Sequence, residues 1–210
     1  MFTGFCVPIG LLLGCLVSLI ASRPSWPAAP VPAPLWVTWH NSGLFNGGFL
    51  FPGTQEPVPS ADGMVHEFLS HQITPGKLGL GIDFFGRVWT GGAAAAAPGP
   101  TEPRAGWSAG MPPRMFEKPY AKIVADDYTR ESYRWDAAAE APYLHLEHPN
   151  PHDNAFVSYD NAASIQRKVA YVRKNGLGGV MLFELWGGWQ QLAAPPDPLL
   201  QAVKSAVFGP

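Results

Sequence analysis

The pattern of apolar and polar positions predicts a helix that begins at Ser60. Met64, Phe68 and Leu69 fall on one face at helical spacing, and serine is a favoured residue for the cap before a first turn. A Pro-Gly pair follows a few residues after this segment and favours a turn. We therefore expect a helix that runs from Ser60 to about His71.

The next segment, Lys77–Phe85, has the alternation typical of a strand. Its larger apolar residues recur at every second position, and they are Leu78, Leu80, Ile82 and Phe84. Gly79 and Gly81 occupy the other face. Glycine in a strand usually marks the close approach of a neighbouring backbone or of a ligand.

A second helix is predicted after Asp160, which we expect to be its cap. The apolar positions Ile165, Val169 and Val172 form one stripe, and Gly176 is the expected stop. The basic residues of this helix are expected on its solvated side and at its C-terminal end, and they are Arg167, Lys168, Arg173 and Lys174.

A continuous apolar run, Gly179–Leu185, follows after a short connection and predicts a strand buried on both faces. Asp197 and Pro198 then predict the start of a last helix. Its inward side is expected to carry four apolar residues, Leu199, Leu200, Val203 and Val207. The order of helix, strand, helix, strand and helix predicts an α/β fold with a parallel sheet.

Two regions between these elements are less regular. Residues 36–59 are aromatic, rich in glycine and short of charge, and predict a long loop of the kind that often carries function. Residues 90–110 include five consecutive alanines and predict a low-complexity loop. Residues 115–157 predict a set of short elements, with strands near residues 143–146 and 155–159.

The N-terminal 34 residues form a separate unit. Residues 1–22 carry no charge and are mostly apolar, so they predict a secretory signal or a membrane tether, and hence a secreted or membrane-tethered protein. Ser25–Pro34 is rich in proline and alanine and predicts an extended linker. The alternative is that residues 1–34 are an artefact of the reading frame. Residues 35–210 form the second predicted unit.

Composition narrows the function classes. A formal net charge of −2 gives no electrostatic reason for binding nucleic acid. Both cysteines, Cys6 and Cys15, lie in the apolar N-terminal segment, so the body of the chain has no zinc spacing, and no cofactor is expected. The six histidines predict neither a metal site nor a Ser-His-Asp arrangement. Eight tryptophans and twelve phenylalanines provide flat faces suited to sugar rings, although most aromatic residues are core.

Three segments in order resemble the chitinase-like glycoside hydrolases of family 18. Lys77–Arg87 resembles the seventh strand of the family's barrel, and Gly176–Leu185 resembles the eighth. Phe156–Asp160 is similar to the return from the family's inserted module. The resemblance implies an α/β fold in the form of a partial (β/α)8 TIM barrel, with about the last two strands and three helices, and a small α+β insertion at about residues 111–157.

The family's catalytic motif is missing. The resemblance implies hydrolysis of β-1,4-linked N-acetylglucosamine polymers with substrate-assisted retention, in which a glutamate at the end of an Asp-x-x-Asp-x-Asp-x-Glu motif donates a proton. No aspartate in this chain begins that motif, and the Met-x-Tyr-Asp of the sixth strand is also missing. We therefore assign no catalytic residue and expect this chain alone to be inactive.

Without the catalytic motif, the resemblance still implies residues that form the wall of a glycan-binding site. It implies that Phe183 stacks on a sugar ring and that Arg87, at the end of a barrel strand, reaches sugar hydroxyls. The predicted substrate-binding residues are Phe183, Arg87, Phe85, Asp83, Trp39 and Trp186. Trp36 and Trp89 are further candidate platforms. Glu184 should point away from Phe183 and need a partner in an apolar strand.

Three hypotheses follow. The first is the C-terminal part of a chitinase-like hydrolase. The second is a non-catalytic chitin-binding protein of the same family. The third is an unrelated small α/β interaction protein that binds no glycan. Under the first two, the partner is chitin or a related amino-sugar glycan.

Overall fold

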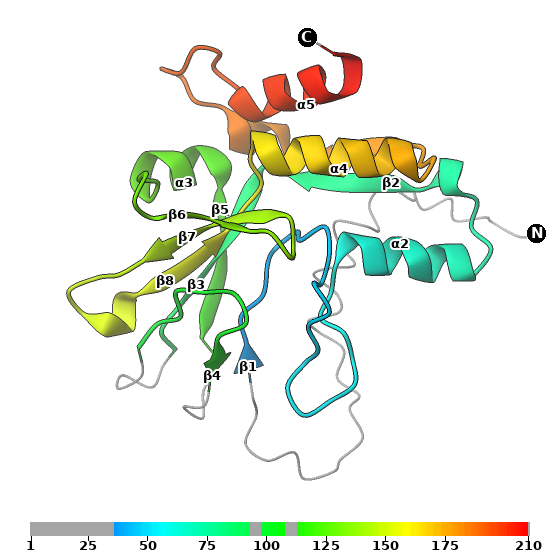
Figure 1. Ribbon diagram of the computed structural model, residues 1–210. Coiled ribbons are helices and arrows are strands. Elements are labelled where there is room, and N and C mark those ends of the chain that lie inside the picture. Colours follow the sequence, from blue (N-terminus) through cyan, green and yellow to red (C-terminus); the bar gives the residue numbers. More distant parts are fainter. Residues whose placement is uncertain (1–35, 93–97, 108–112, 210) are drawn as a thin grey trace, which may run out of the picture.

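Two sheets of different kinds organise the chain (Figure 1). The computed structural model describes residues 36–92, 98–107 and 113–209. The predicted signal or tether at residues 1–22 and the linker at Ser25–Pro34 lie outside these residues. None of the helices in the described ranges has the length and apolar content needed to cross a membrane.

The first sheet is a parallel pair of strands, β2 (Gly79–Asp83) and β9 (Gly179–Phe183). Both strands were predicted from the sequence. Alternate side chains of the pair pack among helices, and these are Leu80, Ile82, Val180 and Leu182. The other face, called here the open face, carries Gly79, Gly81 and Asp83 from β2, and Gly179, Met181 and Phe183 from β9.

Two details of these strands differ from prediction. The strand expected over Lys77–Phe85 ends at Asp83, because Phe84 is buried at the turn into the next strand and its amide donates to Phe183 O at 2.8 Å. The strand expected to be buried on both faces is only half-buried along β9. The reason is that β9 pairs only with β2 among the described strands.

Helices cover one side of the parallel pair. They are α2 (Ala61–Ser70), α4 (Ala162–Lys174) and α5 (Pro198–Phe208), and Figure 1 shows α4 between α5 and β2. Ser60 caps α2, as predicted, and the Asp197 side chain caps α5 by accepting from Leu200 N at 2.9 Å. Gly176 has φ +63°, which fits the predicted stop after α4.

The cap of α4 was predicted one residue too early. Asn161 accepts from the amides of Ala163 and Ser164, and the Ser164 hydroxyl in turn accepts from Asn161 N at 2.9 Å. Lys168 was expected in solvent but is 0% exposed, because it lies on the same face as Ile165 and Val172. On α5, Leu199 and Val203 are buried, whereas Leu200 is exposed.

The second sheet is antiparallel, with strand order β5-β3-β8-β7-β6. Its strands are β3 (Phe85–Thr90), β5 (Arg114–Pro119), β6 (Tyr133–Asp136), β7 (Ala141–Leu146) and β8 (Ala155–Ser158). Helix α3 (Tyr120–Asp126) follows β5 and buries Ile123 against the sheet. The segment that forms this sheet begins at Phe85, directly after Phe84, and lies between β2 and β9 in the sequence.

Short elements complete the fold. Strands β1 (Trp36–Val37) and β4 (Gly106–Trp107) form a two-stranded antiparallel pair, and most of the predicted loop over residues 36–59 lacks regular structure. Single helical turns occur at Pro75–Lys77, Pro151–Asp153 and Leu185–Gly188. The result is a mixed α/β fold, and no sheet closes into a barrel within the described ranges.

Candidate functional site

Phe183 and Asp83 lie next to each other on the open face. They are partners in the parallel register of β2 and β9, so their side chains point to the same side of the pair. Phe183 is 46% exposed at the end of β9, and Phe85 meets its ring edge-on at a centroid distance of 6.2 Å. An exposed aromatic face beside a carboxyl group is therefore the first feature of the site.

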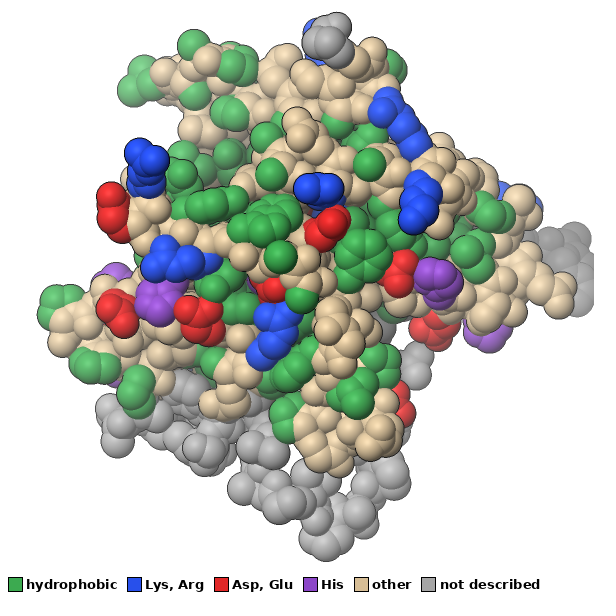
Figure 2. Space-filling view, in the orientation of Figure 1, with side chains coloured by type: hydrophobic (Ala, Val, Ile, Leu, Met, Phe, Trp, Pro, Cys, Tyr) green, Lys and Arg blue, Asp and Glu red, His purple; other side chains and the backbone are tan. Residues whose placement is uncertain are grey.

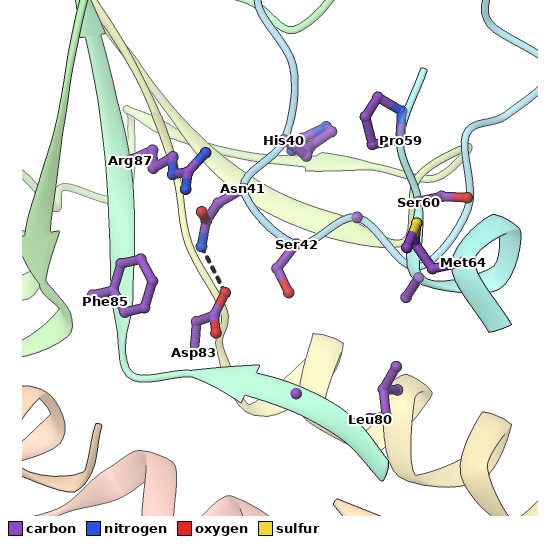
Figure 3. Close-up of a pocket in the computed structure, with 13 residues that line it drawn as sticks. His40, Asn41, Ser42, Pro59, Ser60, Met64, Leu80, Asp83, Phe85 and Arg87 are labelled. Atoms are coloured by element: carbon purple, nitrogen blue, oxygen red, sulfur yellow. Dashed lines mark hydrogen bonds between the residues drawn. The ribbon is translucent and has the colours of Figure 1, made fainter. Parts of the chain in front are cut away.

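A cleft opens beside this pair, between the end of β2, the start of β3 and the segment that follows β1. Figure 3 shows its polar side chains, with Asp83 and Asn41 joined by a hydrogen bond. Asn41 Nδ2 donates to Asp83 Oδ2 at 2.9 Å. Arg87 and Phe85 reach the cleft from β3, whereas His40 and Ser42 flank Asn41. Three sequence-predicted residues, Asp83, Phe85 and Arg87, thus line one cleft.

Asp83 is the electrostatic centre of the cleft. Its side chain is buried, and burial raises the pKa of this carboxyl to about 7, with the neighbouring Asp160 carboxylate acting in the same direction. Lys168, Arg87 and the hydrogen bond from Asn41 oppose this rise in pKa. Asp83 therefore changes charge near neutral pH, where an ordinary aspartate is fully ionised.

The sequence predicted Arg87 at the end of a parallel barrel strand, and this prediction is wrong. Arg87 lies in the middle of β3 in the antiparallel sheet, paired in register with Glu117 and Ser158. Arg87 is 9% exposed, and its Nη2 atom lies 3.7 Å from Glu117 Oε1. The guanidinium still reaches the cleft, because β3 begins only two residues after Asp83.

A buried Ser-His-Asp arrangement, which the sequence did not predict, lies behind the cleft. His40 Nε2 lies 2.9 Å from Asp136 Oδ2, and His40 Nδ1 lies 3.1 Å from Ser158 Oγ. Ser158 is 1% exposed, and its Oγ accepts from Asn41 N at 3.0 Å. No substrate could reach that hydroxyl, so the arrangement holds the structure together and is not a nucleophilic site.

Charge in this arrangement is balanced by Arg104. Its Nη1 atom lies 2.6 Å from Asp136 Oδ2. Burial alone would raise the pKa of Asp136, but hydrogen bonds from His40 and Arg104 bring that pKa below its usual value. Burial also lowers the pKa of His40, more than Asp136 raises it. The pair is therefore a neutral imidazole against a firmly ionised carboxylate.

The predicted tryptophan platforms differ in exposure. Trp39 is 6% exposed, because its ring stacks on Phe49, Arg104 lies over it and its indole nitrogen donates to Pro59 O. It packs the loop and presents no free face to a sugar. Trp186 is 62% exposed just after Phe183.

Apolar exposure continues along the chain beyond Trp186. Trp189 is 58% exposed, and Leu192 is fully in solvent. Figure 2 shows hydrophobic side chains at the projecting loop before α5, at the upper left. Among the described residues, no group of three or more His, Cys, Asp or Glu side chains could hold a metal ion.

Comparison with known proteins identifies the family. The family model of the Glycosyl hydrolases family 18 matches residues 25–187, and the chain belongs to this family. This confirms the resemblance of the three sequence segments and excludes the hypothesis of an unrelated α/β protein.

Relatives that match this chain include chitinases. Chitinase A1 of Niallia circulans is 36% identical over 121 residues, which is 55% of this chain and 16% of that protein. A probable endochitinase of the Orgyia pseudotsugata multicapsid polyhedrosis virus is 31% identical over 111 residues, which is 52% of this chain and 19% of that protein. The structure of the catalytic domain of a psychrophilic chitinase B from Arthrobacter matches with a TM-score of 0.59 and 25% identity, over 84% of this chain and 37% of that one. The chain thus spans less than half the length of each.

Proposed function

We propose that this chain is the C-terminal part of a chitinase-like catalytic unit, in which β2 and β9 are two neighbouring strands of a (β/α)8 barrel. The parallel register of the pair, with helices of the described part of the chain packed on one of its sides, supports this arrangement. The antiparallel sheet that stands between the two strands in sequence is then the family's insertion, and it begins at Phe85. The partial coverage of the relatives supports the same conclusion.

The function we propose for the open face is binding of chitin or a related amino-sugar glycan. The observation that carries it is the exposed ring of Phe183, with Phe85 edge-on to it and Asp83 beside it in register. An exposed aromatic ring flanked by polar groups suits a pyranose, whose ring has an apolar face and a polar rim. Arg87, Asn41 and Ser42 add donors to the cleft.

Replacement of Phe183 by alanine should weaken binding of N-acetylglucosamine oligomers about two- to tenfold, measured by isothermal titration calorimetry. Aromatic stacking contributes roughly 0.5–1.5 kcal/mol beyond the buried area, and about 1.4 kcal/mol corresponds to tenfold in affinity. Phe208→Ala, which removes a more exposed phenylalanine ring at the end of α5, is the control and should bind as the wild type does. Equal affinities of Phe183→Ala and wild type would contradict the proposed platform.

We further propose that the chain binds without hydrolysing, because none of its aspartates begins the Asp-x-x-Asp-x-Asp-x-Glu motif. Purified chain incubated with chitooligosaccharides should release no more product than buffer alone, measured by chromatography of the oligomers. Glu184, which follows Phe183 directly in the sequence, is the carboxylate to test. Turnover by the wild type that is lost in Glu184→Gln would show that this assignment is wrong.

The alternative within the family is a protein that binds chitin and has no catalytic role at all. Its support is the same aromatic surface together with the missing acid motif. The two proposals differ in what happens when the chain is supplied with a polypeptide that carries the family's acid motif: activity appears only for the catalytic unit.

A further inference from the structure

Two tryptophans project from a single helical turn after β9. Trp186 lies in the turn Leu185–Gly188, Trp189 directly follows it, and both side chains are more than half exposed. The Trp189 amide donates to Trp186 O at 3.3 Å, which is the hydrogen bond of a 3₁₀ turn. Because residues three apart in such a turn lie one above the other, the two indoles project from the same side of it.

The two glycines between the indoles hold the turn against the body of the protein, beside α5 (Figure 1). A Cβ atom on Gly187 would lie 2.3 Å from Phe84 O, and one on Gly188 would lie 2.7 Å from Asp197 Oδ1. Both glycines are buried, Phe84 is fully buried, and Asp197 caps α5. Any side chain at the two glycine positions would displace the turn. The turn is therefore fixed on the core, and the exposed indoles are presented to solvent in a set arrangement.

The segment that carries the indoles is uncharged. Residues 185–196 include no Asp, Glu, Lys, Arg or His. Of the carboxylates at its two ends, Glu184 is half-buried and Asp197 is buried. Gln190 and Gln191 add amide donors and acceptors next to the indoles. Flat aromatic faces with neutral polar groups match an amino sugar, whose ring has an apolar face and a rim of hydroxyl and acetamido groups, and the segment offers no charge to an ionic partner.

We propose that Trp186 and Trp189 form a second glycan platform, which holds the protein on the surface of insoluble chitin while Phe183 binds a single glycan chain. This role rests on the proposed binding of amino-sugar glycans by the open face. Trp186 follows Phe183 by three residues and Trp189 follows it by six, so the backbone positions of all three lie within about 20 Å. Rings that project from a fixed turn suit a flat, extended partner, and their fixed arrangement lowers the entropy lost on binding.

The test compares a solid ligand with a soluble one. The full chain is depleted from solution with increasing amounts of chitin powder, and it is titrated with soluble N-acetylglucosamine oligomers in a calorimeter. The double variant Trp186→Ala/Trp189→Ala should bind the powder at least about fivefold more weakly than wild type, because two stacking rings are lost. Its affinity for the soluble oligomers should stay within about twofold of wild type. Unchanged binding to the powder, or an equal loss on both ligands, would overturn the proposal.

Two further variants separate aromatic stacking from general apolar contact. Trp186→Tyr/Trp189→Tyr keeps flat rings and should bind the powder within about threefold of wild type. Leu192→Ala removes an aliphatic side chain that is fully in solvent on the same loop, and it should bind as the wild type does. If Leu192→Ala loses as much binding as the double alanine variant, or if the tyrosines preserve none of it, the surface is not a sugar platform.

Sedimentation velocity tests the other occupant of this surface, a second copy of the chain. Wild type and the double alanine variant should sediment alike, and a dimer that only the wild type forms would assign the indoles to a protein interface and contradict the platform. Failure of the proposed function looks different. A wild type that binds neither oligomers nor powder refutes glycan binding as a whole, whereas oligomer binding combined with powder binding that is independent of the tryptophans refutes the platform alone.

Discussion

Replacement of Lys168 by alanine should destabilise the protein by about 3–5 kcal/mol, measured by urea denaturation followed through tryptophan fluorescence. Lys168 is 0% exposed, and its Nζ atom donates to Asp160 Oδ2 at 2.6 Å and to Ser42 Oγ. Its removal leaves the Asp160 carboxylate, itself 2% exposed, without its buried countercharge. An uncompensated charge in the interior costs far more than a lost surface ion pair.

Lys174→Ala is the matched control, because Lys174 is an exposed lysine on the same helix. Its effect should stay within about 0.5 kcal/mol. The double variant Asp160→Asn/Lys168→Met should lose less than the sum of its single substitutions, because it removes the charge and its partner together. A loss below about 1 kcal/mol for Lys168→Ala would mean that Lys168 is not buried as an ion pair.

Replacement of Asp136 by alanine should cost about 3 kcal/mol in the same urea experiment. The side chain accepts from four donors: His40 Nε2 at 2.9 Å, Arg104 Nη1 at 2.6 Å, Ala138 N at 3.0 Å and Ala139 N at 3.2 Å. The substitution removes the carboxylate partner of the Arg104 guanidinium and the Asp136 partner of the buried His40 Nε2 atom at once. The turn between β6 and β7 also loses both of the bonds that Asp136 makes to its backbone.

The stability that Asp136 contributes should depend on pH in a defined direction. Hydrogen bonds from His40 and Arg104 hold its pKa below the ordinary value of 3.8, so the contribution is present above that pH and is lost as the pH falls below it. Asp126→Ala is the control, because Asp126 is half-exposed and pairs with Lys118 at the surface, where a pair contributes up to about 1 kcal/mol. Similar losses for the two variants would contradict a special role for Asp136.

The helices and the parallel strands were predictable because their signals are local. Ser60 caps α2 through Gly63 N, and Asp197 with Pro198 starts α5, as the sequence indicated. The cap of α4 was wrong for a tertiary reason. Asp160 and Asn161 are equally good caps, but Asp160 is bound to Lys168, so Asn161 takes the position. The same contact explains why Lys168, read as a solvated residue, is buried.

The site was predictable only in part. Asp83, Phe85 and Arg87 were found because the family's strand pattern places them together. His40, Ser158 and Asp136 were missed, because His40 lies about a hundred residues from each of the other two and no spacing rule connects them. The burial of Trp39 and the partial exposure of β9 could not be predicted from the sequence either. The apolar pattern predicts which face of a helix or strand is buried, but it does not predict which neighbouring element covers that face.

The pairing of β2 with β9 has a consequence for how the chain folds. Asp83 and Phe183 are register partners a hundred residues apart, whereas β6 and β7, and likewise β7 and β8, are joined by short connections. The entropy lost in closing a long loop must be met before a distant contact stabilises anything, and chains dominated by such contacts fold slowly. The antiparallel sheet should therefore assemble first and carry the two parallel strands toward each other, so that the open face and its cleft are the last parts of the molecule to form.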